Sequence, residues 1–203
     1  MGTDKAWLDL GGQAMITRVV AALAHVTSSV AVIANDPAYA RLGLPVYADT
    51  NLGIGPLEAI RIALLHSGAP RVVLAACDLP FITSEFFSFL LKLQASHQAV
   101  VPLNRDGLLE PLCGVYSREM LGQVTDLIAS GERKVSCLFD SVPARFIAFS
   151  EFSHLDGAEL QRFHLFLVLV QGRVAVDLDL DLALGQFVRL LVEVFGRLAL
   201  RRV

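Results

Sequence analysis

The sequence predicts an α/β fold: an open, doubly wound and mainly parallel sheet with helices on both faces. The first observation is composition. Apolar residues make up 54% of the chain and charged residues only 18%, a balance typical of strands buried on both faces. The second is the order of elements along the chain, because short apolar runs alternate with helical patterns, as in parallel βαβ units. The third is length, since 203 residues suit one domain with a substantial core.

Helical spacing and turn residues predict the elements of the amino-terminal half. Apolar residues from Ile16 to Val26 recur at helical intervals, which favours a helix starting near residue 13. Pro56 suits the first turn of a later helix, and Gly68 suits its end. The expected elements are this first helix, strands over 30–34 and 44–48, the helix from 56 to 68, and a strand over 71–77.

Capping residues predict two helices in the second half. Thr83 is placed to cap a helix that carries Phe86 and Leu90, and Ser117 is placed to cap another that closes at Gly131. Strands are expected over 99–103, 111–116 and 145–149, the first two joined by a polar turn.

The pattern changes after residue 152. Residues 163–170 are almost purely apolar, and 173–184 alternate with period two, which favours a hairpin with one polar face. Residues 186–203 repeat a charge every fourth position, as an amphipathic helix does. We therefore expect a domain over 1–152 and a separate extension over 153–203 that holds a β-hairpin and a helix.

Composition and charge exclude several classes of function. A net charge of −3 does not indicate the basic surface that nucleic-acid-binding proteins use. The longest uncharged stretch, 19–35, is interrupted by polar residues and is too short for a membrane span. The three cysteines are far apart, which argues against disulfides and zinc. No leader-like segment opens the chain, so the expected location is the cytoplasm.

Three polar residues come just past predicted strands. Ligands of parallel sheets bind beyond the carboxyl ends of the strands, which singles out Asn35, Asp49 and Asp78. Asp78 follows the most apolar strand, and a carboxylate there can hold Mg²⁺ with room for phosphate oxygens, although a solvated loop acid fits the same pattern. Lys5, ahead of a Gly-Gly turn, could neutralise phosphate charge or be an ordinary surface lysine.

A series of segments, taken together, is more specific than any one of them. The chain carries, in this order, DKAWLDLGG at 4–12, ANDP at 34–37, ADT at 48–50, GPL at 55–57, ACDLPF at 76–81, DGLLEPLC at 106–113 and GERKV at 131–135. With these segments the chain resembles, over roughly residues 2–149, the molybdenum cofactor guanylyltransferases, the MobA type of nucleotidyltransferase.

The resemblance implies a Rossmann-like nucleotidyltransferase fold and the transfer of GMP from GTP to molybdopterin phosphate, with release of pyrophosphate. It implies that Lys5 contacts the nucleotide phosphates, that Asn35 and Asp49 lie on the nucleotide side, and that Asp78 holds Mg²⁺. Lys5 and Asp78 are thus the expected catalytic residues. Arg133 and Lys134 are candidates to receive the anionic pterin, or belong to a solvated loop. Molybdoenzymes or their chaperones are implied as partners.

Two departures from the family leave other functions open. The family's glycine-rich loop ends in Met-Gly, and this chain begins at that Met-Gly, so we expect the amino-terminal strand and loop to be missing. The family closes with an Asn-x-Asn-Thr-Pro segment near the active site, and nothing after Phe152 matches that segment. The alternatives are a CTP-using molybdopterin cytidylyltransferase and a catalytically impaired remnant that binds pterin or a partner protein.

Overall fold

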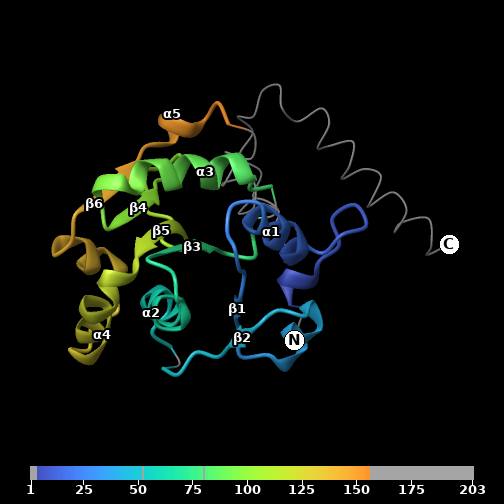
Figure 1. The fold of residues 1–203 in the computed structure, drawn as a ribbon, viewed down its shortest axis with the longest axis horizontal. Helices are drawn as coiled ribbons and strands as arrows, with labels where there is room; N and C mark the ends of the chain where they lie inside the picture. The colour runs from blue at the N-terminus through green and yellow to red at the C-terminus, as the bar shows by residue number, and fades with distance from the viewer. Residues whose placement is uncertain (1–3, 52, 80, 156–203) are drawn as a thin grey trace. The chain divides into compact units, whose positions relative to one another are not determined.

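A computed structural model describes residues 4–51, 53–79 and 81–155 (Figure 1). The chain divides into two compact units, Met1–His164 and Leu165–Val203, and every described residue belongs to the first. The hairpin and helix expected after residue 162 lie outside the described residues. The α-helices are α1 (Met15–Ala24), α2 (Pro56–His66), α3 (Ser84–Leu93), α4 (Leu121–Ala129) and α5 (Phe149–Phe152). The strands are β1 (Val32–Ile33), β2 (Val46–Tyr47), β3 (Arg71–Ala75), β4 (Ala99–Pro102), β5 (Cys113–Ser117) and β6 (Ala144–Ile147).

The described strands form two sheets. The larger has the order β3-β5-β4-β6, and the smaller consists of β1 and β2, which are parallel. In the larger sheet β4 and β6 are parallel, while β5 is antiparallel to both of its neighbours. The strands β3, β4 and β6 therefore run in one direction and only β5 runs against them. The prediction of a mainly parallel α/β sheet is confirmed, with one reversed strand inside it.

Side chains of the larger sheet alternate between its two faces, and each face is covered by helices (Figure 1). Along β4, Val100 packs in a cluster with α1 and α3. Its neighbours Ala99 and Val101 pack in a second cluster with α2 and α4. This period of two is the pleat of a strand buried on both faces, and it confirms the doubly wound arrangement.

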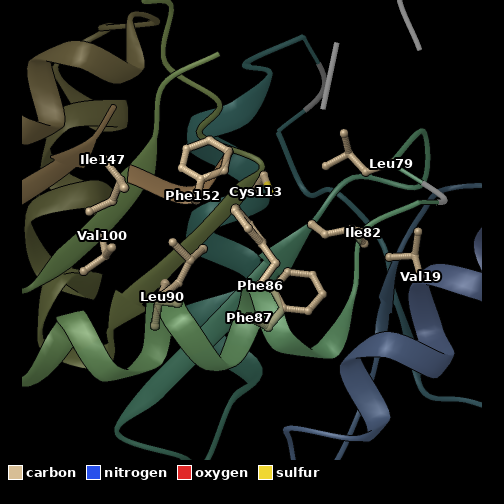
Figure 2. Close-up of a cluster of buried hydrophobic side chains, with 11 residues drawn as sticks. Val19, Leu79, Ile82, Phe86, Phe87, Leu90, Val100, Cys113, Ile147 and Phe152 are labelled. Carbon is tan, nitrogen blue, oxygen red and sulfur yellow. The ribbon is translucent and has the colours of Figure 1, made fainter. Parts of the chain in front are cut away.

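The first cluster fills the space between α3 and the sheet (Figure 2). Thr83 caps α3, as expected, because its side chain accepts a hydrogen bond from the backbone N–H of Phe86. Phe86 and Leu90 then point inward at helical spacing. The buried members of the cluster are Val19, Leu79, Ile82, Phe86, Phe87, Leu90, Val100, Cys113, Val115, Ile147 and Phe152.

The helices α1 and α2 each pack against both sheets. On α1, Ile16 packs in a third cluster with Val32 of β1, whereas Val19 packs with residues of β3 in the first cluster. On the other side, α2 contacts both β1 and β3. A partly buried Cys77, just past β3, packs in the third cluster, so the carboxyl ends of β1 and β3 lie close together.

Several predicted elements are shorter in the structure. The strands expected over 30–34 and 44–48 are paired only at 32–33 and 46–47, because pairing between β1 and β2 is limited to those two positions. Ser117 ends β5, and its side chain caps a 3₁₀ turn, Arg118–Met120, that leads into α4. Phe149 starts the short helix α5 instead of ending a strand.

Gly114 lies at the centre of the larger sheet, where a side chain would collide with a neighbouring backbone. A Cβ atom there would lie 2.9 Å from the carbonyl oxygen of Val100 on β4. We expect Gly114→Ala to lower the free energy of unfolding by about 1–3 kcal/mol, as overpacking of a well-packed core does. Gly122, in α4, is the matched control: its Cβ would meet nothing within 4 Å.

Urea unfolding of both variants checks this expectation. Gly122→Ala should stabilise the protein by up to about 1 kcal/mol, because alanine favours a helix more than glycine does. Equal midpoints for Gly114→Ala and the unaltered chain would show that the sheet accommodates a methyl group at this position.

Candidate active site

The loops that follow β3, β4 and β6 emerge at one end of the larger sheet, because these three strands share a direction. The start of β5 lies at the same end, since Ala75 pairs with Cys113. Asp78 lies here, in a turn after β3, and is partly buried. The loop between β4 and β5 reaches the same end of the sheet. This convergence makes the carboxyl end of the sheet the candidate active site.

The structure brings Lys5 and Asp78 into one neighbourhood, since the charges of both act on the Cys77 thiol. Burial, followed by the negative charges of Asp78 and Asp4, raises the pKa of Cys77 to about 11. The positive charge of Lys5 acts in the opposite direction. Both charged groups therefore lie close enough to Cys77 to act on it. A cation and a carboxylate so placed can flank a phosphate chain and its metal ion.

Contacts around Tyr39 anchor the short helix that carries Lys5. This 3₁₀ helix, η1 (Lys5–Trp7), is capped by Asp4. The Tyr39 hydroxyl donates a 2.7 Å hydrogen bond to the Asp4 carboxylate, and burial together with this carboxylate raises the pKa of Tyr39 above its usual value. The Arg41 guanidinium lies 3.3 Å from the centre of the Trp7 ring, which adds a cation–π contact. Lys5 itself is exposed.

Asn35 and Asp49 lie side by side, as parallel strands require. Ile33 of β1 pairs with Tyr47 of β2, so the residues two positions further along stand at equivalent places. The backbone N–H of Asp49 donates a 2.9 Å hydrogen bond to the side-chain oxygen of Asn35. The two residues that the sequence singled out after these strands therefore form one local unit.

Glu58 is a residue of this region that the sequence analysis missed. It lies in the first turn of α2 and is 1% exposed. Its carboxylate accepts hydrogen bonds from Thr50 and Asn51 and forms an ion pair with Arg61. The only sequence signal was an acidic residue just after Gly-Pro, which an exposed helix start explains equally well.

The loop between β4 and β5 presents a second carboxylate near Asp78. Asn104 organises this loop: its side-chain oxygen accepts from the backbone N–H groups of Asp106 and Leu108, and its Nδ2 donates to Glu110. Burial, followed by the charges of Glu110 and Asp78, raises the pKa of the Cys113 thiol. The sequence marked this segment as a motif and assigned no role to Glu110.

Arg133 and Lys134 lie on the loop after α4 and are exposed. Their backbone N–H groups donate to the Glu132 carboxylate at 2.7 and 2.8 Å. This contact orders the loop backbone and leaves the role of the two side chains as a prediction.

The donor atoms at the sheet end suit a hard cation. Within residues 4–51, 53–79 and 81–155, no three His, Cys, Asp or Glu side chains form a group that could hold a metal ion. Mg²⁺ does not need such a cage, because it takes one or two carboxylates and completes its shell with water and substrate oxygens. Asp78 therefore fits a magnesium site that depends on a phosphate-bearing substrate. In the same residues no helix has the length and apolarity to cross a membrane.

Comparison with known proteins shows that the chain is a nucleotidyltransferase. The model of the MobA-like NTP transferase domain matches residues 1–145. The chain therefore belongs to the MobA-like NTP transferase domain family.

Named relatives lie within this family. A protein of Carboxydothermus hydrogenoformans, named a probable molybdenum cofactor guanylyltransferase, is 33% identical over 151 residues, which cover 74% of this chain and 76% of that protein. A protein of Pelotomaculum thermopropionicum with the same name is 29% identical over 180 residues, 87% of each chain. Among solved structures, molybdopterin-guanine dinucleotide biosynthesis protein A from Archaeoglobus fulgidus matches with a TM-score of 0.64 at 22% identity, covering 78% of this chain and 82% of that one.

Proposed function

We propose that this protein transfers GMP from GTP to the terminal phosphate of molybdopterin. An oxygen of the pterin phosphate attacks the α-phosphorus of GTP, a new phosphorus–oxygen bond forms, and the bond to the β-phosphate breaks, releasing pyrophosphate. The observation that supports this proposal is that the charges of Lys5 and Asp78 both act on the Cys77 thiol, just past β3, in a chain of the MobA-like family. The names of the relatives give the substrates.

Each residue has a role that its place suggests. Lys5 would contact the nucleotide phosphates and offset their negative charge. Asn35 and Asp49, joined by their hydrogen bond, would lie on the nucleotide side. Asp78 would hold Mg²⁺, which neutralises charge on the phosphate oxygens when it is bound. No covalent nucleophile is needed, because phosphoryl transfer depends mainly on positioning and charge.

The attacking group and the partners follow from the same assignment. The pterin phosphate is the nucleophile, and Arg133 and Lys134 would help to receive this anion. The product would pass to molybdoenzymes or to their chaperones in the cytoplasm. The assignment of the pterin rests on the names of the relatives and on the exposed position of the two basic side chains, whereas the partners and the location are what the family resemblance implies.

Calorimetric titration with GTP tests the proposal. We expect binding that requires Mg²⁺ and that weakens in Lys5→Ala, because this variant removes a positive charge that acts on Cys77 while it leaves the capped start of η1 in place. Competition with CTP measures the choice of base, and tighter binding of CTP would reassign the protein as a cytidylyltransferase. Pyrophosphate release in the presence of molybdopterin then measures turnover. A folded chain that binds neither nucleotide would contradict the proposal.

A further inference from the structure

A buried carboxylate links the start of α2 to the segment that follows β2. The Glu58 carboxylate is 1% exposed. Its Oε1 accepts from the backbone N–H of Thr50 at 3.1 Å, from the Thr50 hydroxyl at 2.9 Å and from the backbone N–H of Asn51 at 3.1 Å. Arg61 completes the group, with its Nη2 2.7 Å from Oε1 and its Nε 2.8 Å from Oε2. We call Thr50, Asn51, Glu58 and Arg61 the Glu58 cluster.

The direction of the Glu58 side chain is unusual for its position. Gly55 is the N-cap of α2 and Pro56 begins the helix, so Glu58 occupies the third helical position. A glutamate there ordinarily reaches back to the backbone N–H of the N-cap residue. Here it accepts instead from Thr50 and Asn51, eight and seven residues upstream. The contact therefore fixes a distant loop as well as a helix end.

The Glu58 cluster also holds an ionised carboxylate in the protein interior, where charged groups are rare. Ionised carboxylates are rarely buried unless they are paired, and this one is paired with Arg61. The hydrogen bond from the Arg61 guanidinium, together with those from Thr50 and Asn51, lowers the pKa of Glu58 to about 2 against the opposing effect of burial. Glu58 stays ionised at neutral pH, and its hydrogen bonds to the loop are strengthened by that charge.

The loop that Glu58 holds is the one that follows Asp49. Thr50 and Asn51 are its next two residues, and Asp49 is bound on its other side by Asn35. Resting on the proposed function, we propose that Glu58, supported by Arg61, is a positioning residue for nucleotide binding. It holds the 49–51 segment in the conformation that the nucleotide meets. It touches no reacting atom, so it governs nucleotide affinity and leaves the transfer step unchanged.

Glu58→Gln is the decisive variant, because it keeps the shape of the side chain and removes its charge. We expect the Kd and the KM for GTP to rise at least about tenfold, since hydrogen bonds to a charged group are lost, while kcat stays within about threefold. The Thr50 and Asn51 amides should exchange with deuterium faster in this variant without any nucleotide. Glu151→Gln is the matched control, because Arg145–Glu151 is also a 2.7 Å ion pair but is exposed.

A second variant separates positioning from folding. Thr50→Val removes only the hydroxyl that bonds Glu58 and Arg61, at an exposed position, and should raise the KM for GTP in the same direction. A GTP affinity in Glu58→Gln equal to that of Glu151→Gln would overturn the inference. So would a loss of kcat at unchanged KM. If Glu58→Gln does not fold, unchanged affinity in Thr50→Val overturns it. If the unaltered chain binds no nucleotide, the proposed function fails first and this inference falls with it.

Discussion

Asp78→Ala should lower pyrophosphate release at least about a hundredfold, because it removes the carboxylate proposed to hold Mg²⁺ beside the phosphates. The fold should survive the change. Asp78 lies in a turn beyond β3 and is only partly buried, so its loss leaves the paired strand residues 71–75 untouched. Steady-state pyrophosphate release with GTP, Mg²⁺ and molybdopterin measures the effect, and the thermal unfolding midpoint measures the fold.

Asp126→Ala is the control for this experiment. Asp126 is an exposed acid on α4, so its removal changes the net charge by the same amount. Turnover in this variant should match that of the unaltered chain. Retained turnover in Asp78→Ala would refute the metal role and leave Glu110, the other carboxylate near Cys113, as the residue to substitute next.

Phe86→Ala should destabilise the protein by about 3–5 kcal/mol, the usual cost of truncating a buried phenylalanine. Phe86 is fully buried between α3 and the sheet. Its ring lies 5.2 Å from that of Phe152 and 6.1 Å from that of Phe87, centre to centre, in edge-to-face arrangements. Because α3 follows directly on the turn that holds Asp78, nucleotide binding should weaken as the cluster loosens. Denaturant unfolding gives the free energy.

Phe146→Ala tests whether burial is the cause. Phe146 is 43% exposed on β6 and has one aromatic neighbour, Phe139, at 5.4 Å. Its truncation should cost no more than about 1 kcal/mol, since little apolar surface is lost to water. Similar losses in the two variants would mean that the first cluster is not a main source of stability.

The fold class could be predicted because the apolar spacing, the helix caps and the turn residues all indicate the same helices and strands. Apolar spacing in α1 and α3, the cap at Thr83 and the proline that starts α2 are local signals, and they act through local bonds. The lengths of β1 and β2 could not be predicted. An apolar run shows which residues suit a strand, whereas pairing depends on a neighbour that is distant in sequence. The antiparallel direction of β5 relative to β3 and β4 could not be predicted for the same reason.

For the candidate site, too, local sequence signals could be predicted and contacts between distant segments could not. The sequence could predict Asn35, Asp49 and Asp78 as site candidates, because strand ends can be recognised in a sequence and ligands bind beyond them. The contact between Asn35 and Asp49 could not be predicted, since it depends on the register of β1 and β2. Glu58 was missed because its burial and its contacts with Thr50 and Asn51 are tertiary features, and an acidic residue at the start of a helix is ordinarily expected on the surface.

The antiparallel pairing of β5 has a consequence for how such a protein can diverge. The ladder between β3 and β5 is fixed by main-chain hydrogen bonds from Arg71 to Ala75, which are indifferent to the side chains of the turns beyond it. The two segments that follow β3 and precede β5 leave the sheet together. New side chains can therefore be exchanged within either segment, and a new acceptor accommodated, with no change in strand register. Exposed positions of these segments can thus change ligand preference while the pairing of β3 and β5 stays as it is.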